Sequence, residues 1–214
     1  MKLEGKIIEK TKDIKKAILK CMIFTIAIII FIIIANGVLK NKIFDYDIKF
    51  YNFLLKHRNP ILNTIIKNIT KFGNVFAVTI LTLFGILIIN EKKYKFMIFL
   101  NLYIVVTMNI ILKNIFLRKR PNRLRLIEEK GYSFPSGHAM VSTALYGIFI
   151  YIVYKKVQNK KVRNIIITLL AILIMLIDVS RIYVGVHYTS DVIAGTCLSL
   201  AYLILFIKIV NNIK

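Results

Sequence analysis

Six apolar stretches, each near the length that crosses a lipid bilayer, constrain this chain more than any other feature. They cover about residues 17–39, 73–90, 94–117, 136–154, 164–182 and 188–209. A helix needs roughly 20 apolar residues to span the hydrocarbon core, and open strands would leave backbone polar groups unpaired in lipid. Apolar residues form 57% of the 214-residue chain, which excludes a soluble globular domain. The sequence predicts an all-α integral membrane bundle of six transmembrane helices, in a single membrane domain over 1–214.

Two polar segments accompany these spans. Residues 1–16 are rich in Lys, with apolar residues near helical spacing, which favours a basic amphipathic helix on the cytoplasmic leaflet. A solvated charged tail is the alternative. Residues 40–71 alternate apolar and polar residues on both sides of Pro60, which predicts two short interfacial helices. These helices either frame the entry of a lipid or only pack over the bundle, and both interpretations stay open.

The distribution of Lys and Arg predicts the orientation. Segments on the side of the N-terminus hold 17 of them, and segments on the other side hold 11. This bias places the N- and C-termini in the cytoplasm of a multi-pass plasma-membrane protein. Six Lys and Arg within 118–134 lie on the outer side, where the positive-inside rule does not expect them. Their position indicates a chemical role. Residues 118–135 are therefore expected to be an extracytoplasmic active-site loop.

The net charge of +22 has a simple explanation in a membrane protein. Lys and Arg that flank apolar spans contact anionic lipid headgroups. No basic stretch outside the spans is interleaved with aromatic residues, so a nucleic-acid partner is not expected. Cys21 and Cys197 lie far apart, and the chain holds three His. This pattern predicts no disulfide framework, no metal site and no cofactor.

Residues 180–191, which read S-R-I-Y-V-G-V-H-Y-T-S-D, place charged groups between two apolar runs. His187 and Asp191 are four residues apart and would share one face of a helix. The carboxylate could then accept a hydrogen bond from one ring nitrogen and leave the other basic, as in an oriented nucleophile or base. Arg181 offers a planar fork of donors that suits phosphate. A capped helix start with a chance His–Asp pair is the alternative.

A second cluster, K-N-I-F-L-R-K-R-P, follows the third apolar stretch. Lys113 lies near the end of that predicted helix, and Arg120 follows about two turns later. Both could reach one place at the membrane surface. Two snorkelling cations would give the same pattern.

The third cluster is P-S-G-H, at 135–138. Proline and Ser136 suit the start of a helix, and Gly137 lets an anion approach the backbone N–H groups there. His138 would stand near that anion as a general acid. A loop followed by a helix with an incidental His is the alternative.

Together the three clusters match the needs of phosphoryl transfer. They supply three cations, a helix N-terminus and two His, one of them backed by a carboxylate. Phosphoryl transfer requires stabilised equatorial oxygens, an in-line nucleophile and an acid for the leaving group. The sequence has no paired carboxylates for magnesium, so the cations are expected to be Lys and Arg.

The same clusters, in the same order, resemble the three-motif pattern of the type 2 phosphatidic acid phosphatase superfamily. The stretches G-Y-S-F-P-S-G-H-A-M and S-R-I-Y-V-G-V-H-Y-T-S-D look most like its bacterial integral-membrane lipid phosphatases, including undecaprenyl pyrophosphate phosphatases. The resemblance implies that His187 forms a phosphohistidine, that Asp191 orients it, and that His138 protonates the leaving group and then activates water. It also implies a set of phosphate-binding residues: Lys113, Arg120, Ser136, Gly137 and Arg181.

The implied activity is metal-independent hydrolysis of a membrane lipid phosphate or pyrophosphate at the outer membrane face. Undecaprenyl pyrophosphate, phosphatidylglycerophosphate and phosphatidate are the expected substrates. A lipid phosphotransferase with the same intermediate is one alternative. A non-enzymatic lipid transporter is another, although the sequence lacks the internal repeat typical of transporters. The oligomeric state stays open.

Overall fold

The structure is a computed structural model that describes residues 2–212, with side chains described at residue 11 and from residue 14 onward. Within this range it contains helices and no strand. The helices are α1 (Lys2–Leu39), α2 (Asp45–Lys56), α3 (Pro60–Lys71), α4 (Val75–Ile88), α5 (Lys92–Phe116), α6 (Gly137–Lys156), α7 (Lys160–Tyr183) and α8 (Thr189–Asn212). Five of these are long and apolar enough to cross a membrane, and α3 with α4 could form a sixth, bent span. The predicted all-α membrane fold is confirmed.

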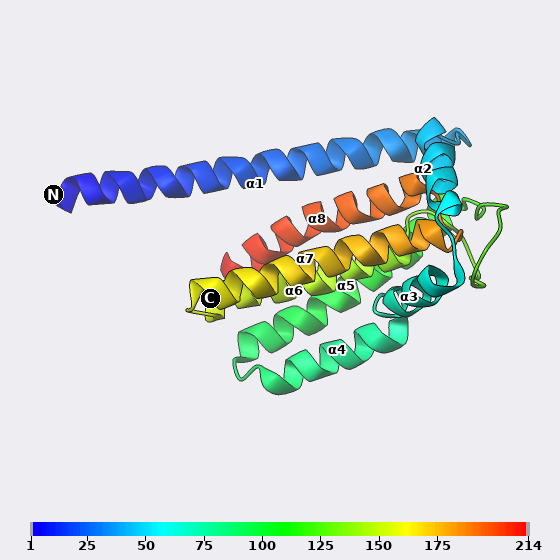
Figure 1. Ribbon diagram of the computed structural model, residues 1–214. Helices are drawn as coiled ribbons and strands as arrows, with labels where there is room; N and C mark the ends of the chain where they lie inside the picture. Colours follow the sequence, from blue (N-terminus) through cyan, green and yellow to red (C-terminus); the bar gives the residue numbers. More distant parts are fainter. Residues whose placement is uncertain (1, 213–214) are drawn as a thin grey trace.

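The long helices run along a common direction and leave the polar segments at one end (Figure 1). Helices α4 to α8 form the bundle, and α1 lies along α8 and projects beyond it. Helices α2 and α3 and the loop 117–136 gather at the right-hand end of the view, whereas both chain ends lie to the left. The segments that carry the predicted motifs therefore meet at the end opposite the termini.

Helix α6 lies at the centre of the bundle, in contact with α5, α7 and α8. Small residues on α6 let its neighbours come close, as is common between membrane helices. Ala139 and Ala144 are fully buried, and a Cβ at Gly147 would lie 2.4 Å from Leu203 Cδ2 of α8. The start of α6, which carries the P-S-G-H motif, is therefore held firmly against α8.

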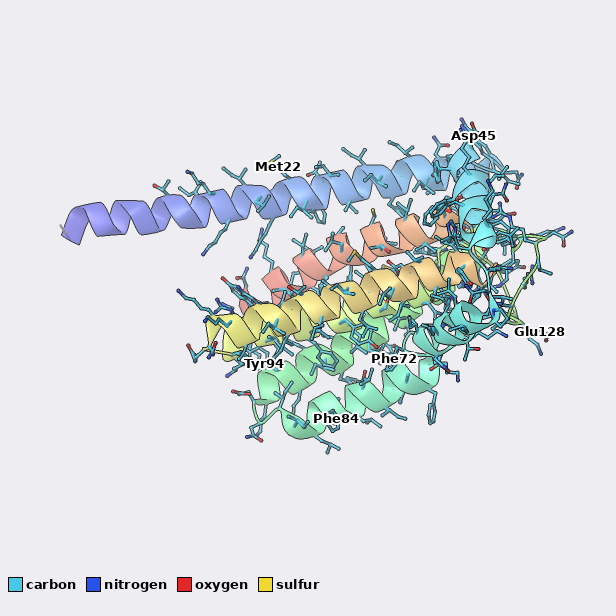
Figure 2. All side chains as sticks on the ribbon, in the orientation of Figure 1. Met22, Asp45, Phe72, Phe84, Tyr94 and Glu128 are labelled. Carbon is cyan, nitrogen blue, oxygen red and sulfur yellow. The ribbon has the colours of Figure 1, made fainter. Side chains whose placement is uncertain are left out.

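The outer helices expose large apolar side chains to their surroundings. Met22 on α1 and Phe84 on α4 point away from the bundle (Figure 2), with 55% and 59% of their surfaces exposed. Exposed apolar surface on this scale is typical of contact with lipid. It agrees with a multi-pass membrane protein.

The expected span at 73–90 is shorter in the structure. Helix α4 has 14 residues, which at about 1.5 Å per residue is less than the roughly 30 Å hydrocarbon core. Asn74 starts it by accepting a hydrogen bond from Ala77 N–H (2.9 Å), and the chain is extended at Ile89. Asn74 thus limits the helix at its start, the extended backbone at Ile89 limits it at its end, and α3 meets it at 50°.

The polar segments 40–71 and 1–16 are also helical. Helices α2 and α3 occupy the first of them, and their place in the membrane interface stays a prediction. Residues from Lys2 onward belong to α1. The amphipathic interpretation of 1–16 depends largely on side chains that lie outside the described residues.

Candidate active site

The loop between α5 and α6, residues 117–136, folds over the short connection between α7 and α8. Two backbone hydrogen bonds fix the path of the loop. Ser133 N–H donates to the carbonyl of Arg118 (2.8 Å), and Leu126 N–H donates to the carbonyl of Val184 (2.9 Å). The first closes the loop on itself and the second fixes it to the end of α7. The loop can therefore carry side chains to fixed positions beside His187.

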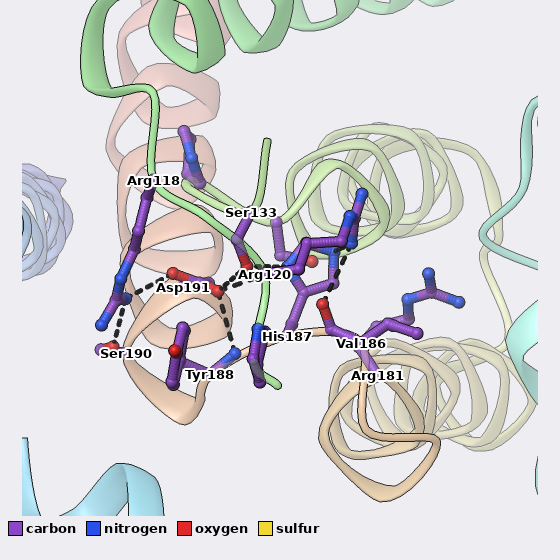
Figure 3. Close-up of polar contacts among 12 residues, drawn as sticks. Arg118, Arg120, Ser133, Arg181, Val186, His187, Tyr188, Ser190 and Asp191 are labelled. Atoms are coloured by element: carbon purple, nitrogen blue, oxygen red, sulfur yellow. Dashed lines mark hydrogen bonds and ion pairs between the residues drawn. The ribbon is translucent and has the colours of Figure 1, made fainter. Parts of the chain in front are cut away.

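The imidazole of His187 lies between Arg120 and Asp191 (Figure 3). Arg120 Nη1 is 3.1 Å from His187 Nε2. A guanidinium group only donates hydrogen bonds, so Nε2 must be the acceptor and the ring proton must be on Nδ1. Nδ1 in turn lies 3.4 Å from Asp191 Oδ2 and 3.3 Å from Ser133 Oγ. The contacts thus select the tautomer in which Nε2 is the free base.

Burial keeps this imidazole neutral. His187 is 2% exposed, and burial lowers its pKa to about 3, although the neighbouring Asp191 acts in the opposite direction. The pKa of Arg120 is also lowered, mainly by burial, yet a guanidinium remains charged at neutral pH. At physiological pH the site therefore presents an unprotonated Nε2 next to a cation.

The carboxylate of Asp191 accepts hydrogen bonds from four groups. Arg118 Nη1 reaches Oδ1 at 2.5 Å. Oδ2 accepts from Tyr188 N–H at 2.9 Å, from the hydroxyl of Ser133 and from His187. Four acceptor sites are what an ionised carboxylate offers, so a full set of donors fixes its orientation. Asp191 thereby holds the His187 ring in place.

Arg118 also links the site to α2, through a residue that the sequence did not reveal. Its Nη2 lies 3.5 Å from Asp47 Oδ2. Asp47 is fully buried and accepts hydrogen bonds from Ser190 N–H (2.7 Å) and Ser190 Oγ (2.8 Å) at the start of α8. Arg118 belongs to the basic segment that the sequence singles out. Nothing near Asp47 signals a contact 143 residues away.

A second carboxylate lies between two predicted phosphate ligands. Arg181, which is 1% exposed, donates from Nη1 to Thr70 Oγ1 (2.7 Å) and from Nη2 to Glu129. The other oxygen of Glu129 is 3.6 Å from Arg120 Nη2. Arg120 is also held by the carbonyl of Val186, at 3.0 Å. The two guanidinium groups therefore already share one anionic group, and Glu129 is a further residue that the sequence did not reveal.

Lys113 contacts this loop, and Ser136 is its last residue. Lys113 Nζ donates to the carbonyl of Tyr132. Ser136 Oγ accepts a hydrogen bond from Ala139 N–H (3.4 Å) and so caps α6. Its own N–H donates to the carbonyl of Asp191 (3.1 Å). Ser136 therefore joins α6 to α8, and its role as a phosphate ligand stays a prediction.

Gly137 and His138 begin α6 beside two close neighbours. A Cβ at Gly137 would lie 3.0 Å from Asn109 Oδ1, and a Cβ at Gly73 would lie 2.8 Å from His138 Cδ2. The turn between α3 and α4 can thus approach the His138 ring only because it carries a glycine. His138 is half-buried and lines a cavity of about 400 Å³ together with Arg181.

The structure brings the predicted residues to one end of the bundle, with different degrees of contact. Arg120, His187 and Asp191 form one hydrogen-bonded row, and Arg181 joins it through Glu129. His138 and Arg181 both line the cavity. Among the described side chains, no group of three His, Cys, Asp or Glu residues is arranged to hold a metal ion.

Comparison with known proteins gives one consistent picture. A family model described as the PAP2 superfamily matches residues 91–214. Phosphatidylglycerophosphatase B of Bacillus subtilis is 29% identical over 177 residues, which cover 79% of this chain and 86% of that protein. Undecaprenyl-diphosphatase of Sulfolobus acidocaldarius is 26% identical over 70% of this chain and 71% of its own length.

A solved structure also resembles this chain. The crystal structure of a transmembrane PAP2 type phosphatidylglycerolphosphate phosphatase from Bacillus subtilis aligns with a TM-score of 0.81 and 25% sequence identity. The alignment covers 89% of this chain and 97% of that one. The similarity thus extends beyond the segment that the family model matches.

Proposed function

Because the chain belongs to the PAP2 superfamily and is a membrane phosphatase, we propose that it hydrolyses a membrane lipid phosphate or pyrophosphate through a phosphohistidine. Phosphatidylglycerophosphate and undecaprenyl pyrophosphate are the favoured substrates, since two relatives are named for these reactions. The observation that carries the mechanism is the row Arg120–His187–Asp191. It leaves one imidazole nitrogen unprotonated and next to a cation.

In the first step, His187 Nε2 attacks the terminal phosphorus. The N–P bond forms while the bond from phosphorus to the leaving oxygen breaks, and His138 supplies a proton to that oxygen. Arg120, Arg181 and Lys113 neutralise the equatorial oxygens. The phosphoryl oxygens replace Glu129 between the two guanidinium groups. The carboxylate of Asp191 stabilises the positive charge that develops on the imidazole.

In the second step, water attacks the phosphohistidine. His138, now unprotonated, accepts a proton from the water as its oxygen bonds to phosphorus. The N–P bond breaks, inorganic phosphate forms, and Nε2 recovers its lone pair. Asp191 keeps the Nδ1 proton in place throughout, so the same tautomer starts the next cycle.

The catalytic end is proposed to face the outside of the cell, with both termini in the cytoplasm. Two observations support this orientation. The termini lie at the end of the bundle opposite the site (Figure 1), and the excess of Lys and Arg is on the side of the termini. In this arrangement residues 117–136 form the extracytoplasmic active-site loop. Helices α2 and α3 then lie in the outer interface.

Phosphate release by the purified protein tests this function directly. Undecaprenyl pyrophosphate, phosphatidylglycerophosphate and phosphatidate are compared in detergent with EDTA present and no added acceptor. We expect phosphate release in EDTA, inhibition by vanadate, and loss of turnover in the His187→Ala variant. Full activity of His187→Ala would overturn the mechanism. Transfer to an added alcohol without free phosphate would instead identify a phosphotransferase.

A further inference from the structure

The cavity beside Arg181 extends the candidate active site towards α3. Its volume of about 400 Å³ lies within the range of small-molecule sites. His138, Arg181 and Glu129 form its inner wall. The outer wall is polar and comes from α3 and the turn after it, through Thr64, Lys67, Asn68, Thr70, Lys71 and Asn74. The cavity is therefore shared between the catalytic residues and a helix that has no role in the proposed chemical steps.

Helix α3 turns a polar face to this cavity and an apolar face to the bundle. The apolar face packs against the end of α7 and the connection to α8 through Leu62, Ile66 and Ile69. Lys67 and Lys71 are four residues apart, so they lie on one face of the helix. Lys71 Nζ also donates to Asn68 Oδ1 (2.9 Å). The packing of α3 thus places the side chains of Lys67 and Lys71 at the cavity wall.

Cations outnumber anions in the cavity wall. Lys67, Lys71 and Arg181 contribute three positive charges, and Glu129 contributes one negative charge. Thr70 and Glu129 hold the Arg181 guanidinium in place through Nη1 and Nη2. The charge of the wall therefore suits an anion.

The geometry of the reaction indicates which part of a substrate enters the cavity. An in-line displacement places the nucleophile and the leaving group on opposite sides of phosphorus. His138, the proposed acid for the leaving oxygen, lines the cavity, whereas the cavity wall does not include His187. We infer that Lys67 and Lys71 bind a second phosphate, carried by the leaving group, and so make the enzyme prefer lipids with two phosphates. This inference rests on the proposed function.

The three substrates differ in what remains after the terminal phosphate is removed. Undecaprenyl pyrophosphate leaves a lipid monophosphate whose charge is next to the cleaved bond. Phosphatidylglycerophosphate leaves a phosphodiester on the far side of a glycerol. Phosphatidate leaves an uncharged diacylglycerol. Only the first two leaving groups carry a phosphate that Lys67 and Lys71 can bind. They differ in the distance from the cleaved bond to that phosphate.

The test compares kcat/KM for these three lipids in the wild type and in the Lys67→Gln/Lys71→Gln variant. For lipids with a second phosphate we expect kcat/KM to fall about tenfold, mainly through KM, the scale of one lost charge-assisted hydrogen bond. For phosphatidate we expect a change below about threefold, because its leaving group is uncharged. A loss for only one of the two lipids that carry a second phosphate would identify which distance between the phosphates the lysines fit.

Controls separate this inference from the proposed function. The Lys160→Gln/Lys161→Gln variant removes two exposed charges at the other end of the bundle and should leave all three values unchanged. The Lys67→Arg/Lys71→Arg variant keeps both charges and should retain the preference for lipids with two phosphates. The single exchanges Lys67→Gln and Lys71→Gln alter exposed side chains, so folding does not limit the comparison. Equal losses on all three lipids, or no loss on any, would overturn the inference. Absence of phosphate release by the wild type would instead overturn the function.

Discussion

Arg120 has two effects on His187, one structural and one electrostatic. Its Nη1 contacts Nε2, which fixes the ring proton on Nδ1. Its charge also stands where the phosphoryl oxygens of a substrate would gather. Asp191 completes the arrangement from the opposite side of the ring. The tautomer that a nucleophile needs is therefore set by two neighbours rather than by Asp191 alone.

Replacing Asp191 by Asn should cost several orders of magnitude in kcat. An amide has no charge to balance Arg118 and cannot accept from all four donors. The corresponding change in serine-protease triads costs about 10⁴-fold. Phosphate release by the purified variant measures the loss, and a loss below tenfold would mean that Asp191 is structural. Asp178→Asn is the matched control, since this buried carboxylate binds Thr196 (2.6 Å) outside the site.

The buried neutral state of His187 predicts a pH dependence of stability. Its pKa is about 3 in the folded protein, against about 6.5 in an unfolded chain. The unfolded state therefore binds more protons between these values. The stability is fully present above pH 6.5 and decreases as the pH falls towards 3. The Tm in detergent should drop more between pH 7.5 and 4.5 for the wild type than for His187→Gln. Equal drops would contradict this prediction.

A local pattern in the sequence brings His187 and Asp191 together, but no such pattern reveals the residues that contact them. His187 and Asp191 are four residues apart, so a local pattern reveals them. The buried carboxylate of Asp47 comes from a different helix and meets Ser190 across 143 residues, which no local pattern encodes. Glu129 lies in an irregular loop, where no periodicity indicates the direction of a side chain. Its position depends on how the loop folds over the end of α7.

At the scale of secondary-structure elements, the turn between α3 and α4 packs directly against His138, the proposed general acid. Gly73 in this turn lies against the His138 ring and Ile177, and a Cβ there would be 2.8 Å from each. The backbone of this turn therefore lies directly against the His138 side chain, with no side chain of Gly73 between them. The apolar stretch at 73–90 predicts a helix, but composition alone does not show that its first residue lies against His138.

Exchanging Gly73 for Ala should displace the His138 ring. Neither an imidazole nor a β-branched Ile177 side chain can easily move away from a contact of 2.8 Å. Misplacing a catalytic group by about 1 Å can cost roughly 100-fold in rate. We expect kcat to fall about 10- to 100-fold while KM changes less, as measured by phosphate release. An unchanged kcat with a lowered Tm would show that Gly73 serves packing only.

The helix boundaries show why an apolar stretch only approximates a span. Residues 73–90 predict one membrane helix, yet α4 begins after Asn74 and ends before Ile89. Hydropathy averages over such capping residues. The cap and the 50° bend to α3 follow from local hydrogen bonding and packing, which an averaged pattern does not contain.

At the scale of the whole molecule, the two ends of the bundle differ in chemistry. Glu128 in the loop 117–136 and Tyr94 near the start of α5 mark these ends (Figure 2). The first end holds the buried ion pairs of the site. The second carries exposed cations at the connection between α6 and α7, with Lys156 paired to Glu91. This separation agrees with the proposal that catalysis takes place at one end of the bundle.

Cysteine labelling in intact cells should establish the orientation. In a Cys21→Ser/Cys197→Ser background, Glu128→Cys and Gln158→Cys each place one thiol at an exposed position, at opposite ends of the bundle. A membrane-impermeant maleimide should label the cysteine at 128 before lysis and the one at 158 only after lysis. The reverse result would place the active site in the cytoplasm. Retained phosphatase activity is the control for folding of both variants.

The family match begins at residue 91, but two ion-pairing arginines depend on residues before it. Arg118 reaches back to Asp47, and Arg181 reaches back to Thr70. A fragment cut at the family boundary would retain every side chain assigned to the chemical steps and still lose one partner of each arginine. The segment that the family model matches is therefore smaller than the unit whose side chains hold the site together. Transplanting the motif-bearing half onto another scaffold would also require substitutes for α2 and α3.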